Sequence, residues 1–417
     1  MEDVHWQRTL WIMFVAQLIS AVGFSVIFPF LPLYVQQLPS SWHLEAKLLA
    51  GLVFSSQALT MMIASPIWGS LGDRFGRKLM VKRSLFGGAL VLAAMAYVRT
   101  AEELVALRAF QGLVTGVISS ANALVAAAVP RHRMGYAMGV MQLGLTAGIA
   151  VGPLLGGILA DTVGYRVAFL ITGALLAMAG VLVTVGVREV FQAPEGDKPR
   201  GFSSGLWKSW QSVFQHPGVG MAYGLRFFAY LGRMMIVPIA PFFIQTLLGP
   251  EASVNTFTGL VFAVVAFTGA LSAVLWGRLG DRIGHERVLV MCALLSGIAY
   301  VPQSFVQEAW QLLALQAVCG LAMGGTLPST SALLAAYTTP GEEGAVYGLD
   351  SSVVSGSRAV APLIGAAVAQ GFGLRATFTA TGILFFLMAL LALRALPSLR
   401  YRCSSKASLG SDMGEAD

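Results

Sequence analysis

The chain has 417 residues, of which 56% are hydrophobic and 11% are charged, and its mean hydropathy is +0.73. An ordinary soluble domain is about a quarter charged and under half apolar, so this composition excludes a soluble globular protein. The formal net charge of +7 would suit a nucleic-acid partner only if the basic residues formed one patch, and they do not.

Apolar runs long enough to cross a membrane recur along the chain with short polar breaks between them. A bilayer core about 30 Å thick requires about 20 apolar residues of helix. The first run, residues 10–35, is much longer than the roughly 7–15 residues of a signal-peptide core, so we interpret it as a retained helix. The sequence predicts about twelve spans, with approximate limits 9–35, 47–70, 79–98, 103–129, 135–160, 165–188, 218–247, 254–277, 287–306, 310–336, 344–370 and 373–396.

One long polar stretch divides the predicted spans six and six. The chain is therefore predicted to have an N-terminal six-helix half (1–188), a cytoplasmic linker (189–217), a C-terminal six-helix half (218–396) and a cytoplasmic tail (397–417). The tail is rich in Ser and Gly, a composition typical of disorder.

The basic residues gather on one side of the predicted membrane. With the N-terminus in the cytoplasm, the cytoplasmic breaks hold 19 Lys and Arg residues and the opposite breaks hold 4. Such a bias is the positive-inside signal of multi-pass proteins, so both termini are predicted to be cytoplasmic. The basic excess indicates topology rather than nucleic-acid binding, and we expect a multi-pass protein of the cell (inner) membrane.

The two halves repeat each other in sequence. Trp68-Gly69-Ser70-Leu71-Gly72-Asp73-Arg74 recurs 208 positions later as Trp276-Gly277-Arg278-Leu279-Gly280-Asp281-Arg282. An even number of spans per half means that both halves enter the membrane in the same direction. Their relation by an axis along the membrane normal is the geometry of alternating access. The predicted fold is therefore an all-α membrane protein with two pseudo-symmetric six-helix bundles.

Three motifs stand out in the first half. The loop after span 2 holds Gly69, Asp73, Arg74, Gly76, Arg77 and Lys78, and its second-half copy holds Gly277, Asp281, Arg282 and Gly284. Span 4 holds Arg108, followed by Gln111, Gly112 and Gly116. Span 5 holds Gly139, Gly148, Gly152, Pro153, Gly156 and Gly157. Glycines on one face of a transmembrane helix allow close helix packing.

In these motifs residues 8–396 resemble the major facilitator superfamily, and specifically its twelve-helix drug/proton antiporter group of bacterial multidrug efflux proteins. The resemblance implies that Asp73 braces the closed cytoplasmic side against span 11, that Arg108 takes part in proton coupling, and that the span-5 glycines mark an antiporter. Span 11 carries only a degraded copy of the last motif, Ala361-Pro362-x2-Gly365. Loss of transport by Asp73→Asn, with normal membrane insertion, is expected from this role.

Ionisable residues within spans are costly and are functional candidates by default. They are Arg108, Arg226, Arg233, Asp350 and Arg358. An Arg226–Asp350 pair is expected from their matching depth, which would leave Arg233 and Arg358 for water or an anion. Asp350 and Arg108 are the proton-coupling candidates. The substrate-cavity candidates are Arg226, Tyr230, Arg233, Gln316 and Arg358, with interhelical hydrogen bonding open as the alternative for Gln316.

The sequence departs from the antiporter group in span 1, where many members carry an acidic residue and this chain has none. The surplus of Arg within spans favours neutral or anionic substrates over cations.

We therefore expect proton-coupled efflux of amphipathic small molecules. Export of an organic anion or lipid-linked metabolite remains the alternative, and a non-transporting receptor or scaffold is the alternative of another class. The sequence predicts no enzyme, because no nucleophile–base set lies within the spans, and no cofactor or metal, because it holds no ATP-binding loop or ligand cluster. The expected partners are a small-molecule substrate, protons and the lipid bilayer, with the chain acting as a monomer.

Overall fold

The computed structural model describes residues 2–189, 219–249, 252–337 and 343–395, and its regular elements there are helices. The elements of the first half are α1 (Glu2–Ser25), α2 (Leu31–Gln37), α3 (Ala46–Phe75), α4 (Arg77–Met95), α5 (Ala101–Val114), α6 (Val117–Ala128), the 3-10 helix η1 (Arg131–Arg133), α7 (Met134–Val163) and α8 (Tyr165–Gly186). Those of the second half are α10 (Val219–Met235), α11 (Ala240–Leu248), α12 (Val254–Ile283), α13 (His285–Tyr300), the 3-10 helix η2 (Val301–Phe305), α14 (Ala309–Met323), α15 (Thr326–Tyr337), α16 (Glu343–Phe372) and α17 (Leu374–Ala395).

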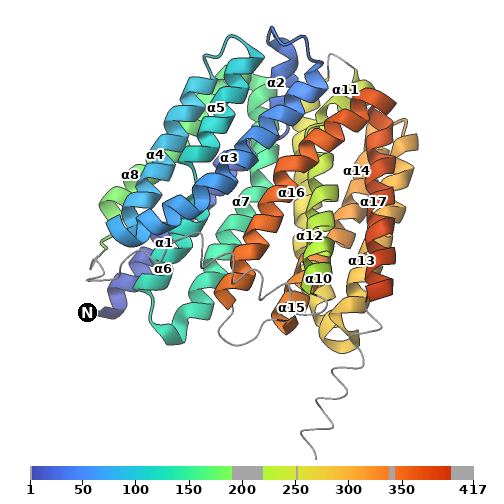
Figure 1. Ribbon diagram of the computed structural model, residues 1–417. Helices are drawn as coiled ribbons and strands as arrows, with labels where there is room; N and C mark the ends of the chain where they lie inside the picture. The colour runs from blue at the N-terminus through green and yellow to red at the C-terminus, as the bar shows by residue number, and fades with distance from the viewer. Residues whose placement is uncertain (1, 190–218, 250–251, 338–342, 396–417) are drawn as a thin grey trace, which may run out of the picture.

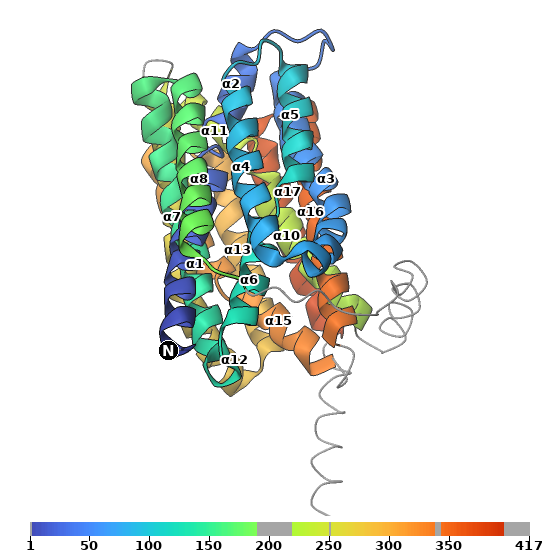
Figure 2. The same cartoon turned by 90° about the vertical axis from the view of Figure 1, so that its left-hand side faces the viewer.

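The two halves lie side by side, the first on the left and the second on the right of Figure 1. The N-terminus lies at the lower end of the bundle, and α2 and α11 lie at the upper end (Figures 1 and 2). These are called the N-terminal end and the α2/α11 end. The predicted linker 189–217, apart from its first residue, and the predicted tail 397–417 lie outside the described residues.

Eleven helical stretches of the described residues are long and apolar enough to cross a membrane. The predicted third span, α4, is 19 residues long, but Arg77, Lys78, Lys82 and Arg83 fall within its first two turns. It packs against α5, α6 and α8 and so completes the six helices of the first half. The predicted all-α fold of two six-helix bundles is confirmed.

Spans 1, 4, 7 and 10 are each built of two helices rather than one. The break between α1 and α2 holds Pro29, and the break between α10 and α11 holds Pro238. A proline cannot donate the backbone hydrogen bond that a continuous helix requires. In span 4 the break falls at Gly116, whose φ of +150° disfavours any residue with a side chain.

The internal repeat is visible as duplicated contacts. The indole Nε1 of Trp68 donates to the carbonyl oxygen of Leu113 at 2.6 Å, and Trp276 donates to Leu321, 208 positions later in each case, at 2.8 Å. The buried apolar residues also form two large clusters, one mainly in each half. In the first, the Tyr34 and Phe169 rings meet at 5.5 Å between centroids; in the second, Phe243 and Phe378, each 209 positions later, meet at 4.8 Å. The halves are thus two packed units built on one pattern.

Candidate functional site

The halves contact each other at the α2/α11 end. A Cβ on Gly157 of α7 would overlap the backbone of Asn255 in α12, and a Cβ on Gly259 of α12 would overlap the carbonyl of Pro153. On the opposite flank, a Cβ on Gly51 of α3 would lie 2.9 Å from the carbonyl oxygen of Pro362 in α16. Absence of side chains at these points lets the backbones of the two halves touch.

A carboxylate joins the halves at the same end. The Asp161 carboxylate, near the end of α7, accepts hydrogen bonds from Asn255 Nδ2 at 2.6 Å and from the backbone N–H of Thr256 at 2.7 Å. The backbone donor lies in the first turn of α12, where the helix dipole also favours an anion. Tyr165 Oη lies 3.4 Å from Asn255 Nδ2. Asp161 was not among the predicted site residues, because nothing local distinguishes it from an exposed acid at a helix end and its partner lies 94 positions away.

The antiporter motif divides between two neighbours. Cβ atoms on Gly148, Gly152 and Gly156 would collide with α1, the one on Gly152 lying 3.0 Å from the carbonyl oxygen of Val22. Ser25 Oγ donates to the carbonyl oxygen of Gly148 at 3.1 Å across this seam. Gly157 instead faces α12 in the other half, and Gly139 would meet nothing within 4 Å. The motif therefore packs α7 against α1 along most of its length and against the second half at its end.

Arg108 is buried inside the first half, with 1% of its surface exposed. Its Nη1 donates to Gln111 Oε1 at 2.7 Å, and its guanidinium carbon lies 5.5 Å from the Phe54 ring centroid. The Nε and Nη2 atoms have no hydrogen-bond partner, and no described carboxylate pairs with it. Gln316, the equivalent residue of the second half, is also buried and donates to Gln303 Oε1 at 3.0 Å.

The ion pair expected between Arg226 of α10 and Asp350 of α16 is present. Arg226 Nη1 also donates to Thr330 Oγ1 at 3.1 Å and to Ser331 Oγ at 2.9 Å, both in α15. One guanidinium therefore joins three elements of the second half, and its charge is balanced by a carboxylate.

Two further arginines of the second half, Arg233 and Arg358, have no acid partner among the described residues. The guanidinium carbons of Arg226 and Arg358 lie 5.8 and 5.4 Å from the Tyr230 ring centroid. Arg358 is exposed although it sits in the middle of α16. It lies within electrostatic range of Arg233, which is half-buried. Among the described residues, the second half thus presents two positive charges without an acid partner, Arg358 beside Tyr230 and Arg233 near Arg358.

Comparison with known proteins places this architecture in a family. The family model of the Major Facilitator Superfamily matches residues 13–225 and again residues 222–409. The chain belongs to the Major Facilitator Superfamily. It is 35% identical over 381 residues to the multidrug resistance protein MdtG of Enterobacter lignolyticus, covering 91% of this chain and 90% of that protein.

Solved structures of two transporters share the fold at low sequence identity. The nucleoside transporter NupG superposes with a TM-score of 0.76 at 11% identity, covering 94% of this chain and 98% of that chain. The human organic anion transporter MFSD10 superposes with a TM-score of 0.66 at 19% identity, covering 93% and 99%. This protein is therefore a superfamily membrane transporter, as predicted, and its family is one of transporters rather than enzymes.

The superfamily loop motif lies at the N-terminal end, between α3 and α4. The side chain of Asp73 is outside the described part of the structure, so its predicted brace against span 11 stays a prediction. Arg74 is exposed, and Arg77 Nη1 donates to the carbonyl oxygen of Ala123 at 3.0 Å. Gly76 turns the chain with φ of +96°, as does its counterpart Gly284.

Glu189, which was not among the predicted site residues, holds this motif from the segment that follows α8. Its two carboxylate oxygens accept from the backbone N–H groups of Arg77 and Lys78, each at 2.9 Å. In the second-half copy, Asp281 instead meets His285 Nε2 at 3.2 Å, one turn along. Arg282 is exposed, and Gly277 has open space around it.

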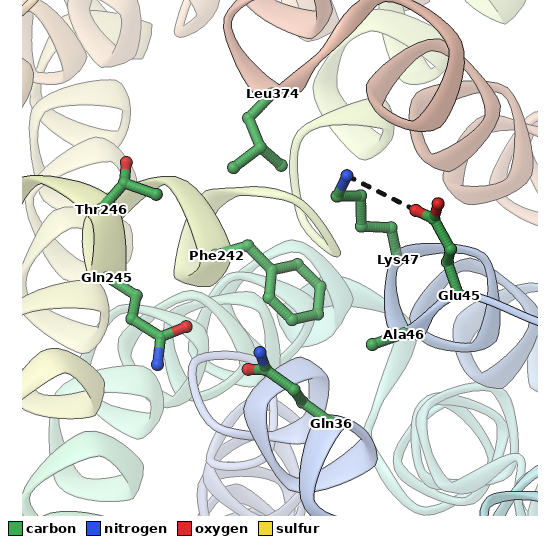
Figure 3. Close-up of a pocket in the computed structure, with 8 residues that line it drawn as sticks. All are labelled: Gln36, Glu45, Ala46, Lys47, Phe242, Gln245, Thr246 and Leu374. Atoms are coloured by element: carbon green, nitrogen blue, oxygen red, sulfur yellow. Dashed lines mark ion pairs between the residues drawn. The ribbon is translucent and has the colours of Figure 1, made fainter. Parts of the chain in front are cut away.

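A cavity of about 300 Å³ lies between the halves at the α2/α11 end (Figure 3). Its lining residues come from α2, α3, α11 and α17 and from the residue before α3: Gln36, Glu45, Ala46, Lys47, Phe242, Gln245, Thr246 and Leu374. Lys47 Nζ lies 3.5 Å from Glu45 Oε2. The cavity is small, and none of the arginines of the second half lines it.

Proposed function

We propose that the chain is a secondary active transporter that exports amphipathic small molecules in exchange for protons by alternating access. The observation that carries the proposal is the close contact between the halves at the α2/α11 end. At that end Asp161 of α7 accepts hydrogen bonds from Asn255 and Thr256 of α12, and Tyr165 Oη lies 3.4 Å from Asn255 Nδ2. Closure at one end of the bundle is one of the two states that alternating access requires. Similarity to a multidrug resistance protein supports the choice of substrate.

The membrane orientation follows from charge. The basic residues of the loop motif lie at the N-terminal end, which we assign to the cytoplasm of a cell membrane. In this assignment the structure is closed on the outer face. One chain contains both halves, so a monomer is sufficient for transport.

Proton coupling is assigned to Asp350 with Arg108 as a second participant. Asp350 is paired with Arg226, and a neighbouring cation favours the ionised carboxylate. Proton uptake therefore requires the pair to separate, which links a protonation event to movement of α16 against α10. Arg108 has no equivalent charge in the second half, which supports a role other than packing.

Export of organic anions is the second candidate, favoured by Arg233 and Arg358. Neither has an acid partner among the described residues, so both can attract an anionic group and repel a cation. At an effective dielectric of 20, unit charges about 4 Å apart interact by roughly 4 kcal/mol, and about 1.4 kcal/mol changes an affinity tenfold. The fold is shared with a human organic anion transporter.

Everted membrane vesicles with an imposed pH gradient test both candidates. Matched cationic and anionic dyes are offered to the wild type and to Arg233→Gln and Arg358→Gln. Accumulation that needs the gradient supports proton-coupled export, and loss of the anion preference in both variants supports the arginine assignment. Strong export of quaternary ammonium dyes, unchanged in both variants, would refute the anion assignment while leaving export itself intact.

A further inference from the structure

A second cavity lies at the N-terminal end, on the outside of the first half. It measures about 580 Å³ and is lined by Phe75, Lys78, Leu79, Lys82, Arg188 and Glu189. These residues come from the end of α3, the first two turns of α4 and the segment that follows α8. None of these residues lies at the contacts between the halves or among the arginines of the second half.

The cavity has an excess of positive charge. Its one carboxylate, Glu189, already accepts two backbone hydrogen bonds at the start of α4. Lys78 Nζ donates to the carbonyl oxygens of Thr184 and Val187 at 2.9 and 2.6 Å, but neutral carbonyls do not cancel its charge. Lys82 and Arg188 have no ion-pair or hydrogen-bond partner within the described ranges. Three cations therefore share one anion.

The start of α4 adds to this excess. The positive end of a helix dipole favours anions, yet the first two turns of α4 carry four basic residues. Two of them point elsewhere: Arg83 lies over the Trp68 ring at 3.4 Å, and Arg77 donates to Ala123 in α6. Lys78 and Lys82 are four residues apart and so share one helix face, which is the face toward the cavity. A bound anion would relieve this repulsion.

The remaining walls are apolar and uncovered. Phe75 is 60% exposed and Leu79 is 48% exposed. Phe75 is the last residue of α3 and Leu79 lies in the first turn of α4, directly beside the basic groups. Basic pockets between transmembrane helices bind anionic lipid headgroups. A free anion would use the cations alone, whereas a phospholipid would also cover Phe75 and Leu79 with its acyl chains.

We propose that this cavity binds an anionic phospholipid, with its phosphate at Lys82 and Arg188 and its acyl chains against Phe75 and Leu79. The bound lipid would hold α4 to the end of α8 beside the superfamily loop motif. The proposal requires only that the chain is embedded in a bilayer and does not depend on any exported substrate.

The test uses the purified full-length protein in phosphatidylethanolamine nanodiscs to which phosphatidylglycerol is added in steps. Lipid retained by the protein is measured by native mass spectrometry. The double variant Lys82→Gln/Arg188→Gln is compared with Arg131→Gln/Arg133→Gln, which removes two exposed charges from η1, outside the cavity. Each basic residue near an anionic surface contributes about 1 kcal/mol, which is about fivefold in affinity. The cavity variant should therefore bind phosphatidylglycerol roughly 25-fold more weakly than the wild type, and the control should change less than twofold.

One more variant and one competitor distinguish a lipid site from a free-anion site. Leu79→Glu places a carboxylate on an exposed wall and should weaken phosphatidylglycerol binding even if the double variant fails to fold. Inorganic phosphate should not displace the lipid; full displacement would identify a free-anion site and overturn the lipid assignment. Equal weakening of phosphatidylglycerol binding in the cavity and control variants would mean that binding reflects only the general surface charge, and would overturn the proposal. Unchanged binding in all variants would also overturn it.

Discussion

The two halves share their packing contacts but not their charges. A Cβ on Gly156 would overlap the carbonyl of Val26, and 209 positions later a Cβ on Gly365 would overlap the carbonyl of Met235. By contrast, the first-half positions equivalent to Arg226, Arg233, Asp350 and Arg358 are Gln17, Phe24, Met141 and Ile149. Contacts that repeat are those any six-helix bundle of this type requires. Charges that do not repeat are the better candidates for function, because an ionisable group within a span is costly and packing does not need it.

The charged sites also differ in how they are balanced. Arg226 has a carboxylate partner and two hydroxyl partners, whereas Arg108 has one amide partner and two unsatisfied nitrogens. Removing one partner from a buried pair leaves an uncompensated charge. Substitution of one member of the second-half pair should therefore lower the stability of the fold most. Substitution of Arg108 should impair transport with little effect on stability.

The largest effect is expected from Asp350→Asn. It leaves Arg226 without its anion, and breaking a buried pair in this way costs about 3–5 kcal/mol in soluble proteins. The midpoint temperature of thermal unfolding in detergent should fall clearly below that of the wild type. The double variant Arg226→Gln/Asp350→Asn should recover most of the stability and none of the proton-coupled transport. Recovery of transport in the double variant would assign the pair to structure alone.

Glycine substitutions test whether the close helix contacts that repeat in both halves contribute to stability. Gly156→Val and Gly365→Val should destabilise by similar amounts, about 1–3 kcal/mol each, because both overfill a close helix contact. Gly139→Val is the matched control, since nothing lies within 4 Å of its Cβ position. Stability is measured by thermal unfolding. A Gly139→Val variant as unstable as Gly156→Val would contradict the packing account.

Arg108→Gln makes the first half resemble the second at this position. We expect proton-coupled export to fall at least about tenfold, the equivalent of about 1.4 kcal/mol, with membrane insertion and thermal unfolding close to those of the wild type. The reverse change, Gln316→Arg, is the comparison variant and should not restore export in Arg108→Gln. Full export by Arg108→Gln in pH-gradient vesicles would remove Arg108 from the coupling mechanism.

The smallest effect is expected from Asp161→Asn. The amide still accepts a hydrogen bond but loses its charge at the start of α12, an interaction of about 0.3–1 kcal/mol. The population closed at the α2/α11 end should therefore fall by up to about fivefold. Distances between spin labels placed on α2 and α11 report that population. Asp281→Asn, at the opposite end of the bundle, is the control and should not shift it.

Much of this architecture follows from the sequence alone. Runs of about 20 apolar residues specify helices wherever they occur, and a fixed offset between matching residues specifies two equivalent halves, so neither inference needs to know which helices touch. Depth counted along a helix also predicted the Arg226–Asp350 pair, because a buried charge at one level of the bundle needs a partner at the same level.

Only the tertiary structure decided which neighbour each helix face meets. Helical periodicity puts Gly148, Gly152 and Gly156 on one face of α7, but it cannot say that this face meets α1 while Gly157 meets α12 of the other half. Asp161 is 94 positions from Asn255, and Glu189 is 112 positions from Arg77. Nothing local distinguishes these carboxylates from exposed acids at helix ends. Their partners are set by how whole helices pack across the bundle, which depends on every contact surface at once.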